Sequence, residues 1–184
     1  ENPSIAINNG DRYVYNKDRQ ITLQLDADDA HFMRISRNEQ FENARWEPIA
    51  EEKVIILSEP DGAKTFYAQF RDQAGNDSDV VQSSIILDTS PPVIEAFTIN
   101  DGQEWTNDEE KKVTLHIRGE AASHMMISEK ASFEGIDWQP YRDTIEDYIL
   151  PGEDGEKYLY VVLKDEAGNV SRPAQARIML KRSF

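Results

Sequence analysis

The sequence predicts an all-β protein made of two tandem, seven-stranded antiparallel β-sandwiches that are joined by a short proline-containing linker. Two observations lead to this prediction. The 184-residue chain repeats itself over nearly its whole length, and within each copy apolar residues alternate with polar ones. Alternation with a period of two is typical of strands that bury one face.

The repeat is visible in matched motifs at a constant spacing. Ile7–Gly10 (Ile-Asn-Asn-Gly) recurs 92 positions later as Ile99–Gly102 (Ile-Asn-Asp-Gly). After one inserted residue the spacing becomes 93, and Arg71–Asn76 recurs as Lys164–Asn169. Agreement in register over this length indicates two copies of one domain.

The seam between the copies lies at Asp88-Thr89-Ser90-Pro91-Pro92. We therefore expect one domain over residues 1–90 and a second over residues 91–184. Consecutive prolines favour extended polyproline geometry, so the linker is expected to be stiff.

Within the first copy, apolar residues mark about seven strands. Ile21, Leu23 and Leu25, for example, share one face of a strand, with polar residues between them. The expected strands lie near residues 3–7, 20–26, 31–36, 44–48, 53–57, 64–71 and 79–87. Short antiparallel strands with one apolar face pack as two sheets, because an open sheet would leave that face in water. The expected architecture is an immunoglobulin-like or fibronectin-III-like sandwich.

The strongest local motif is an Asp-x-Ala-Gly-Asn segment before the last strand of each copy. Glycine and asparagine tolerate positive φ, and an aspartate accepts hydrogen bonds from backbone N–H groups across a turn. The motif is therefore expected to close a tight hairpin, which gives its residues a structural role. These residues are Asp72, Gly75 and Asn76 in the first copy, and Asp165, Gly168 and Asn169 in the second.

With these turns, Phe70–Asn76 and Leu163–Asn169, and with Thr89-Ser90-Pro91-Pro92 between the copies, the sequence resembles the tandem immunoglobulin-like modules of bacterial extracellular proteins. The resemblance covers both copies. It implies a spacer, stalk or adhesive module in a secreted or surface-anchored protein. The chain departs from immunoglobulin domains proper because it contains no cysteine.

The composition excludes several classes of partner. The 35 acidic and 20 basic residues give a formal charge of −15, so nucleic acid and anionic lipid, which need a basic surface, are not expected to bind. No run approaches the roughly 18 apolar residues of a membrane span, so membrane insertion is not expected. Because the sequence starts at Glu1 without a methionine, we expect a segment of a longer protein whose partners include its neighbouring domains.

Signatures of catalysis are missing from the sequence. It has no Gly-x-Ser-x-Gly elbow, no glycine-rich phosphate loop and no His-Glu-x-x-His motif. Paired carboxylates such as Glu51-Glu52 are expected on solvated turns. We therefore expect no enzyme and assign no catalytic residue.

Aromatic residues are the natural candidates for ligand contact. Trp46 and Trp138 are expected in the core because apolar or small residues flank each of them two positions away; stacking on a ligand is the alternative. Tyr67 and Tyr160 have the opposite parity and are either exposed platforms or bonded to nearby loops. Trp105 is expected near the seam, with a ligand contact as the alternative.

No metal centre is expected; the alternative is a calcium ion at the junction between the two copies. Sandwich topology brings Glu120 and the Asp165–Asn169 turn toward the linker residue Asp88, with Asp61 approaching from the first copy. Converging oxygen atoms are typical calcium ligands. The simpler interpretation is that Asp165 and Asn169 bond only within their own turn.

The sequence thus predicts a non-catalytic structural or adhesive segment of a larger bacterial secreted or surface protein. The alternative is a module that binds a glycan or a surface protein through exposed loops and aromatic residues. The second copy is favoured for that role, because Tyr158 and Tyr160 share one face of a strand, whereas Thr65 and Tyr67 occupy the matched positions in the first copy.

Overall fold

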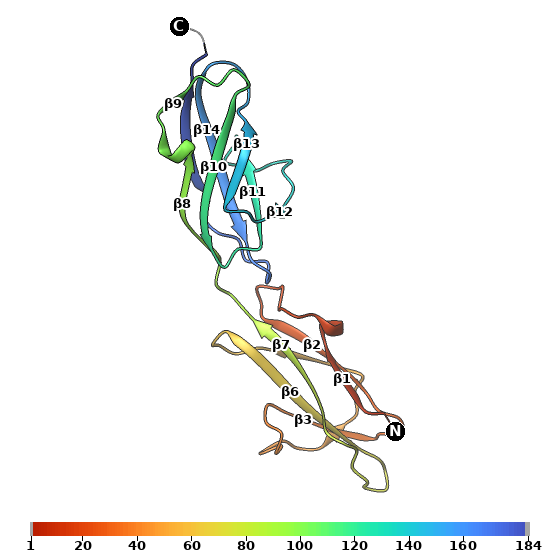
Figure 1. Ribbon diagram of the computed structural model, residues 1–184. Helices are drawn as coiled ribbons and strands as arrows, with labels where there is room; N and C mark the ends of the chain where they lie inside the picture. The colour runs from red at the N-terminus through yellow and green to blue at the C-terminus, as the bar shows by residue number, and fades with distance from the viewer. Residues whose placement is uncertain (1, 183–184) are drawn as a thin grey trace. The chain divides into compact units, whose positions relative to one another are not determined.

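The computed structural model describes residues 2–182 and is all-β, as predicted (Figure 1). Helical structure in this range is limited to two three-residue 3-10 turns, η1 (Asn8–Gly10) and η2 (Asn100–Gly102). The chain divides into two compact units, unit 1 (Glu1–Thr89) and unit 2 (Ser90–Phe184). No helix among the described residues is long and apolar enough to span a membrane.

Unit 1 has seven strands within its described residues, arranged in the sheets β1-β2-β5 and β4-β3-β6-β7. The strands are β1 (Ser4–Ile7), β2 (Gln20–Asp26), β3 (Phe32–Ser36), β4 (Glu47–Pro48), β5 (Glu52–Ile56), β6 (Gly62–Arg71) and β7 (Val81–Leu87). The expected strand over 44–48 is thus reduced to two residues. All strand pairs in these two sheets are antiparallel.

Unit 2 has eight strands within its described residues, in the sheets β13-β10-β8 and β12-β11-β14-β15-β9. They are β8 (Val93–Ile99), β9 (Trp105–Thr106), β10 (Lys112–Glu120), β11 (His124–Ser128), β12 (Gln139–Pro140), β13 (Thr144–Ile149), β14 (Gly155–Lys164) and β15 (Ala174–Leu180). Unit 2 differs from the expected seven strands by β9, which pairs in parallel with the end of β15. The corresponding contact in unit 1 is a single parallel bridge between Tyr13 and Ile86.

Each unit has its own hydrophobic core, formed by both of its sheets. In unit 1, Leu23 of β2 and Phe70 of β6 are buried in one cluster, and in unit 2, Leu115 of β10 and Leu163 of β14 are buried in another. The alternation in sequence explains this arrangement, because every second side chain of these strands points to the same face.

The one inserted residue of the second copy is accommodated in β13. Ile21 and Leu23 of unit 1 pair in regular register with β5, whereas the register between β10 and β13 shifts between Val113 and Leu115. Asp147 has a φ of 55° at this irregularity. Insertion of one residue as a β-bulge preserves the inward faces on both sides of it.

The repeated Ile-Asn-Asx-Gly motif forms the same turn in both units. The side-chain oxygen of Asn8 accepts a hydrogen bond from the Thr22 N–H at 2.8 Å, and Asn100 accepts one from Thr114 at 2.8 Å. The following residues, Asn9 and Asp101, have φ values of 58° and 55°. Asparagine and aspartate tolerate this left-handed conformation, which accounts for the residue types in the motif.

Candidate functional site

The Asp-x-Ala-Gly-Asn segment of unit 1 lies between β6 and β7. Both carboxylate oxygens of Asp72 accept hydrogen bonds from Asn76, one from its backbone N–H at 2.8 Å and one from its side-chain amide at 2.7 Å. These bonds hold the pKa of Asp72 below its ordinary value, and the bond from the Asn76 side chain has the largest effect. Gly75 has a φ of 93°, which favours glycine. The Ser78 hydroxyl accepts a hydrogen bond from the Phe70 N–H at 3.0 Å and ties the turn to β6.

Unit 2 builds the same turn. Asp165 accepts bonds from the backbone and the side chain of Asn169 at 2.8 and 2.9 Å, and Gly168 has a φ of 90°. Ser171 accepts a bond from the Leu163 N–H at 2.9 Å, as Ser78 does in unit 1. The two serines are not among the residues predicted from the sequence, although each lies two residues after the asparagine of its turn. Their identical spacing was the signal that could have revealed them.

Trp46 does not lie in the core, so that expectation is wrong. Arg34 and Arg71 alternate with buried residues of β3 and β6 and therefore point outward. Their guanidinium carbons lie 4.8 and 4.0 Å from the centre of the half-buried Trp46 ring. Arg34 also covers Phe41 at 4.5 Å, and Arg71 is held by Asp77 through bonds of 2.5 and 3.1 Å. The ring is thus one layer of a cation–π stack on the outer sheet face.

Trp138 is also half-buried rather than part of the core, and its stack is smaller. The Lys164 ammonium lies 4.3 Å from the ring centre. Met126 occupies the place of Arg34, and Val170 occupies the place of Asp77. The expectation failed for both tryptophans because each ring precedes a strand of only two residues, so the parity of its neighbours does not define an inward face.

Two carboxylates of the calcium alternative, Asp61 and Asp165, accept hydrogen bonds within their own units. Asp61 accepts hydrogen bonds from the Thr89 N–H at 2.8 Å and from the Thr89 hydroxyl at 3.0 Å. The carboxylate of Asp165 is bonded to Asn169, as described above. Within residues 2–182, no group of three or more His, Cys, Asp or Glu side chains is placed to hold a metal ion.

The Asp61–Thr89 contact has a counterpart that sequence reasoning also missed. Asp154 accepts a hydrogen bond from the Arg182 N–H at 2.7 Å and another from the Arg182 side chain at 2.7 Å. Asp61 and Asp154 are separated by 93 positions, and so are Thr89 and Arg182. In each unit, an aspartate at the matched position therefore fixes the backbone just after the last strand. We call these two contacts the exit anchors.

The outer face of the five-stranded sheet in unit 2 exposes several apolar side chains. Trp105 of β9 is 51% exposed, Met179 of β15 is 39% exposed and Tyr158 of β14 is 37% exposed. Tyr160 is half-buried on the same face of β14, two residues beyond Tyr158. Between these side chains, Glu156 accepts a hydrogen bond from Arg177 at 2.9 Å. A hydrogen bond with Glu156 raises the pKa of the Tyr158 hydroxyl.

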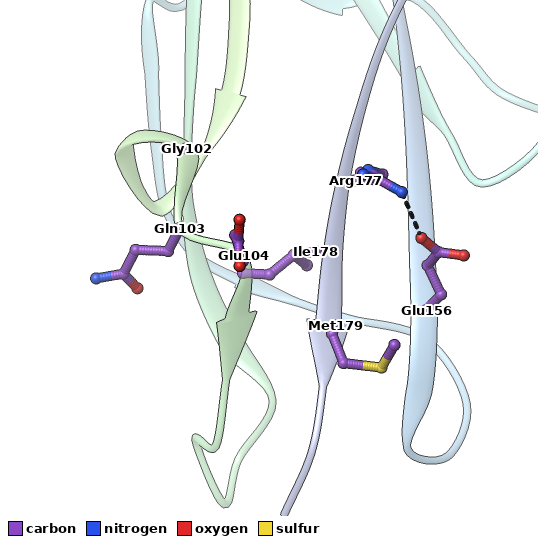
Figure 2. A pocket seen from close by; sticks show the side chains of 7 residues that line it. All are labelled: Gly102, Gln103, Glu104, Glu156, Arg177, Ile178 and Met179. Atoms are coloured by element: carbon purple, nitrogen blue, oxygen red, sulfur yellow. Dashed lines mark hydrogen bonds and ion pairs between the residues drawn. The ribbon is translucent and has the colours of Figure 1, made fainter.

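A shallow groove of about 450 Å³ lies beside this exposed face (Figure 2). It runs between the segment from η2 to β9 and the strands β14 and β15, and Figure 2 shows Arg177 pointing toward Glu156. Its lining residues are Gly102, Gln103, Glu104, Glu156, Arg177, Ile178 and Met179. The groove thus combines hydrogen-bonding groups with an apolar edge, and the exposed Trp105 follows directly after Glu104.

Comparison with solved structures identifies the fold. Fibronectin(III)-like modules of Clostridium thermocellum CbhA superpose with a TM-score of 0.53 at 11% sequence identity, over 97% of this chain and 94% of that chain. The chain has a fibronectin-III-like fold. This confirms the resemblance to immunoglobulin- and fibronectin-III-like modules of bacterial proteins. At this identity the fibronectin-III-like match establishes the fold alone.

Other comparisons add nothing to the assignment of this fibronectin-III-like chain. The BSP domain of a biofilm associated protein matches with a TM-score of 0.30 and 14% identity, over 99% of this chain and 30% of that chain. No protein-family model matches the sequence, and no curated protein matches it.

Proposed function

We propose that the chain is a non-catalytic structural or adhesive segment of a larger bacterial secreted or surface protein, in which two fibronectin-III-like modules act in tandem as a spacer. The proposal treats residues 1–90 and 91–184 as two copies of one sandwich, the second with an added edge strand. Separate cores and matched turns in the two units support it. Its partners are then the neighbouring domains of the same protein, and its location is outside the cell.

The exit anchors carry this proposal. A spacer fixes the orientation of the next module only if the chain leaves each module at a fixed point. In unit 1 the Asp61 carboxylate holds the backbone N–H of Thr89, immediately before the Ser90-Pro91-Pro92 segment. Unit 2 repeats the device with Asp154. A charge-assisted bond to a backbone N–H is stronger than a neutral one, so each anchor holds the chain at the point where it leaves its unit.

Single-molecule energy transfer tests the spacer. The chain has no cysteine, so dyes can be placed at exposed positions by Lys17→Cys in unit 1 and Glu109→Cys in unit 2. We expect a narrow distribution of transfer efficiency, because Pro91-Pro92 restricts the backbone. Asp61→Ala should broaden the distribution, because it releases Thr89.

The matched control is Asp154→Ala, which removes the anchor after unit 2 and should leave the distribution between the dyes unchanged. A broad distribution in the unaltered chain would contradict the rigid spacer. An Asp61→Ala variant that matches the unaltered chain would show that the anchor does not contribute.

A second role is favoured by one observation. The exposed rings and the groove of unit 2 belong to a sheet face whose counterpart in unit 1 lacks the Glu156–Arg177 pair. Ligand recognition by unit 2 is compatible with a spacer, because the exit anchor of unit 2 lies at Asp154 and Arg182, outside the residues that line the groove.

A further inference from the structure

A row of outward-facing side chains, three of them aromatic, crosses the outer face of unit 2. We define the aromatic strip as Trp105, Met179, Tyr158 and Tyr160. In the sheet register, Trp105 lies beside Met179, Met179 lies beside Glu156, and Arg177 lies beside Tyr158. All point outward, since the residues that alternate with them, such as Ile178 and Leu159, are buried. The strip therefore continues over three neighbouring strands.

The spacing of the strip follows from sheet geometry. Trp105 is in register, through Met179, with Glu156, two residues before Tyr158. The Trp105 and Tyr158 backbones are therefore roughly 10 Å apart across the sheet and roughly 7 Å apart along it. Tyr158 and Tyr160 are two residues apart on one strand, or roughly 7 Å. Rings at these separations fit an extended chain lying on the surface rather than a compact molecule in a pocket.

The two copies differ at this site while retaining the same fold. At the positions of Glu156, Tyr158 and Arg177, unit 1 has Ala63, Thr65 and Ser84. Thr65 and Ser84 simply bond to each other at 2.8 Å. The polar network of unit 2 is exposed and contributes nothing to the core, so the fold does not require it.

We propose that the aromatic strip and the adjoining groove bind a neutral polysaccharide. Sugar rings present apolar C–H faces that stack on aromatic rings and hydroxyl groups that donate and accept hydrogen bonds. The strip supplies Trp105 and Tyr158 for stacking, and the groove supplies Glu104, Glu156 and Arg177 for the hydroxyls. A bound polysaccharide keeps part of its hydration, so the exposed Glu156–Arg177 pair stays partly in contact with water.

Charge argues against other occupants. Two carboxylates and one guanidinium line the groove, and the whole chain carries a formal charge of −15, so acidic polysaccharides are repelled. A dry protein interface would bury the Glu156–Arg177 pair in its centre, where charged residues are depleted because their desolvation is costly. A neutral polysaccharide both stacks on the aromatic rings and forms hydrogen bonds with the Glu156–Arg177 pair.

Affinity electrophoresis of the full chain tests the proposal. Gels contain cellulose derivatives, β-glucan, xylan, mannan, galactan or soluble chitin oligomers, beside an acidic polysaccharide and a ligand-free gel. We expect at least one neutral polymer to retard the chain and the acidic polymer to have no effect. Trp105→Ala should weaken binding roughly tenfold, by loss of one aromatic contact, and Trp105→Phe should restore most of it.

Two further variants separate the site from general effects. Tyr158→Thr with Arg177→Ser and Glu156→Ala installs the unit 1 residues and should abolish retardation. Tyr15→Ala removes an exposed ring of unit 1 and should leave retardation unchanged. Unfolding midpoints of all variants report whether each still folds. In nuclear magnetic resonance titrations, the indole signal of Trp105 should shift while those of Trp46 and Trp138 do not.

The proposal is overturned if the chain migrates identically in every neutral gel. It is also overturned if only the acidic polymer retards the chain, or if Trp105→Ala migrates like the unaltered protein. Capture of a peptide library by the same face without polysaccharide binding would assign the strip to a protein partner instead. None of these outcomes bears on the energy-transfer test of the spacer.

Discussion

Removal of one hydroxyl group by Tyr141→Phe should destabilise unit 2 and leave unit 1 unchanged. The Tyr141 hydroxyl donates a hydrogen bond to the Ile117 carbonyl at 2.8 Å and accepts one from the Gly119 N–H at 3.0 Å. The register between β10 and β8 shifts between Arg118 and Gly119. At such an irregularity the ladder leaves backbone groups without strand partners, and the hydroxyl satisfies two of them.

The magnitude follows from these two bonds. Each intramolecular hydrogen bond contributes about 0.5–1.5 kcal/mol net, and Tyr141 is half-buried, so water can replace part of the loss. We expect a loss of about 1–2 kcal/mol in the free energy of unfolding of unit 2. For a unit of this size, that loss lowers Tm by roughly 5–15 °C.

Urea denaturation followed by resolved amide signals of each unit measures the effect. Unit 1 is the internal control, because Ile49 and Ala27 occupy the positions of Tyr141 and Gly119 and no equivalent hydroxyl exists there. The slope of free energy against urea should not change, since the exposed area is the same. A loss below about 0.5 kcal/mol in unit 2, or an equal loss in unit 1, would refute the reasoning.

Four further outcomes are expected. Trp46→Ala should lower the free energy of unfolding of unit 1 by about 2–3 kcal/mol, because two cations cover this ring. Trp138→Ala should lower that of unit 2 by about 1–2 kcal/mol, because one cation covers its ring. Equal losses in urea denaturation would show that the cations do not contribute. Gly75→Val should cost unit 1 about 1–2 kcal/mol, because a β-branched residue resists positive φ, and an unchanged urea midpoint would argue against this turn. The pKa of Asp72 is lowered by bonds from Asn76, and the pKa of Asp77 is lowered by Arg71. Because both folded-state pKa values lie below the unfolded ones, the two ionised carboxylates stabilise the fold fully above about pH 4, and this stabilisation disappears as the pH falls through the folded-state values. Asp77→Val should therefore reduce the loss of thermal stability in acid. An unchanged dependence of Tm on pH would refute this prediction. Calorimetric titration with calcium after chelation should show no binding heat, because Asp61 and Asp165 are bonded within their own units, and a saturable heat would restore the calcium alternative.

The sequence predicts regular strands well and irregular segments poorly. Strand β2 lies at residues 20–26 as expected, because three buried side chains in alternation define its face. The same parity argument predicts an inward Trp46, but this residue lies before a strand of only two residues. Parity carries no information where the backbone is not extended. Its actual neighbours, Arg34 and Arg71, come from two other strands and could not be paired with it from local pattern.

The exit anchors were beyond prediction for a different reason. Asp61 matches Asp154 in a visible Asp-Gly repeat, but the donor that both anchors share is a backbone N–H, in Thr89 and Arg182. The side-chain donors differ, a hydroxyl in Thr89 and a guanidinium in Arg182. A backbone donor leaves no signature in residue type, so the repeat showed only the accepting half of each contact. The distance of 28 residues within each pair also excludes any local turn pattern.

Comparison of the two copies separates what the fold needs from what it tolerates. Contacts that both units retain, such as those of Asp72 and Asp165, organise the same turn in both sandwiches. The outer face of the larger sheet differs between the copies: Arg34 and Asp77 support a closed stack in unit 1, whereas Met126 and Val170 replace them in unit 2. Unit 2 therefore keeps an open outer face without loss of its core, and an open face on a stable support is the physical requirement for surface recognition. Exchange of Trp105, Glu156, Tyr158 and Arg177 with their unit 1 counterparts Tyr13, Ala63, Thr65 and Ser84 should transfer binding while leaving both folds intact.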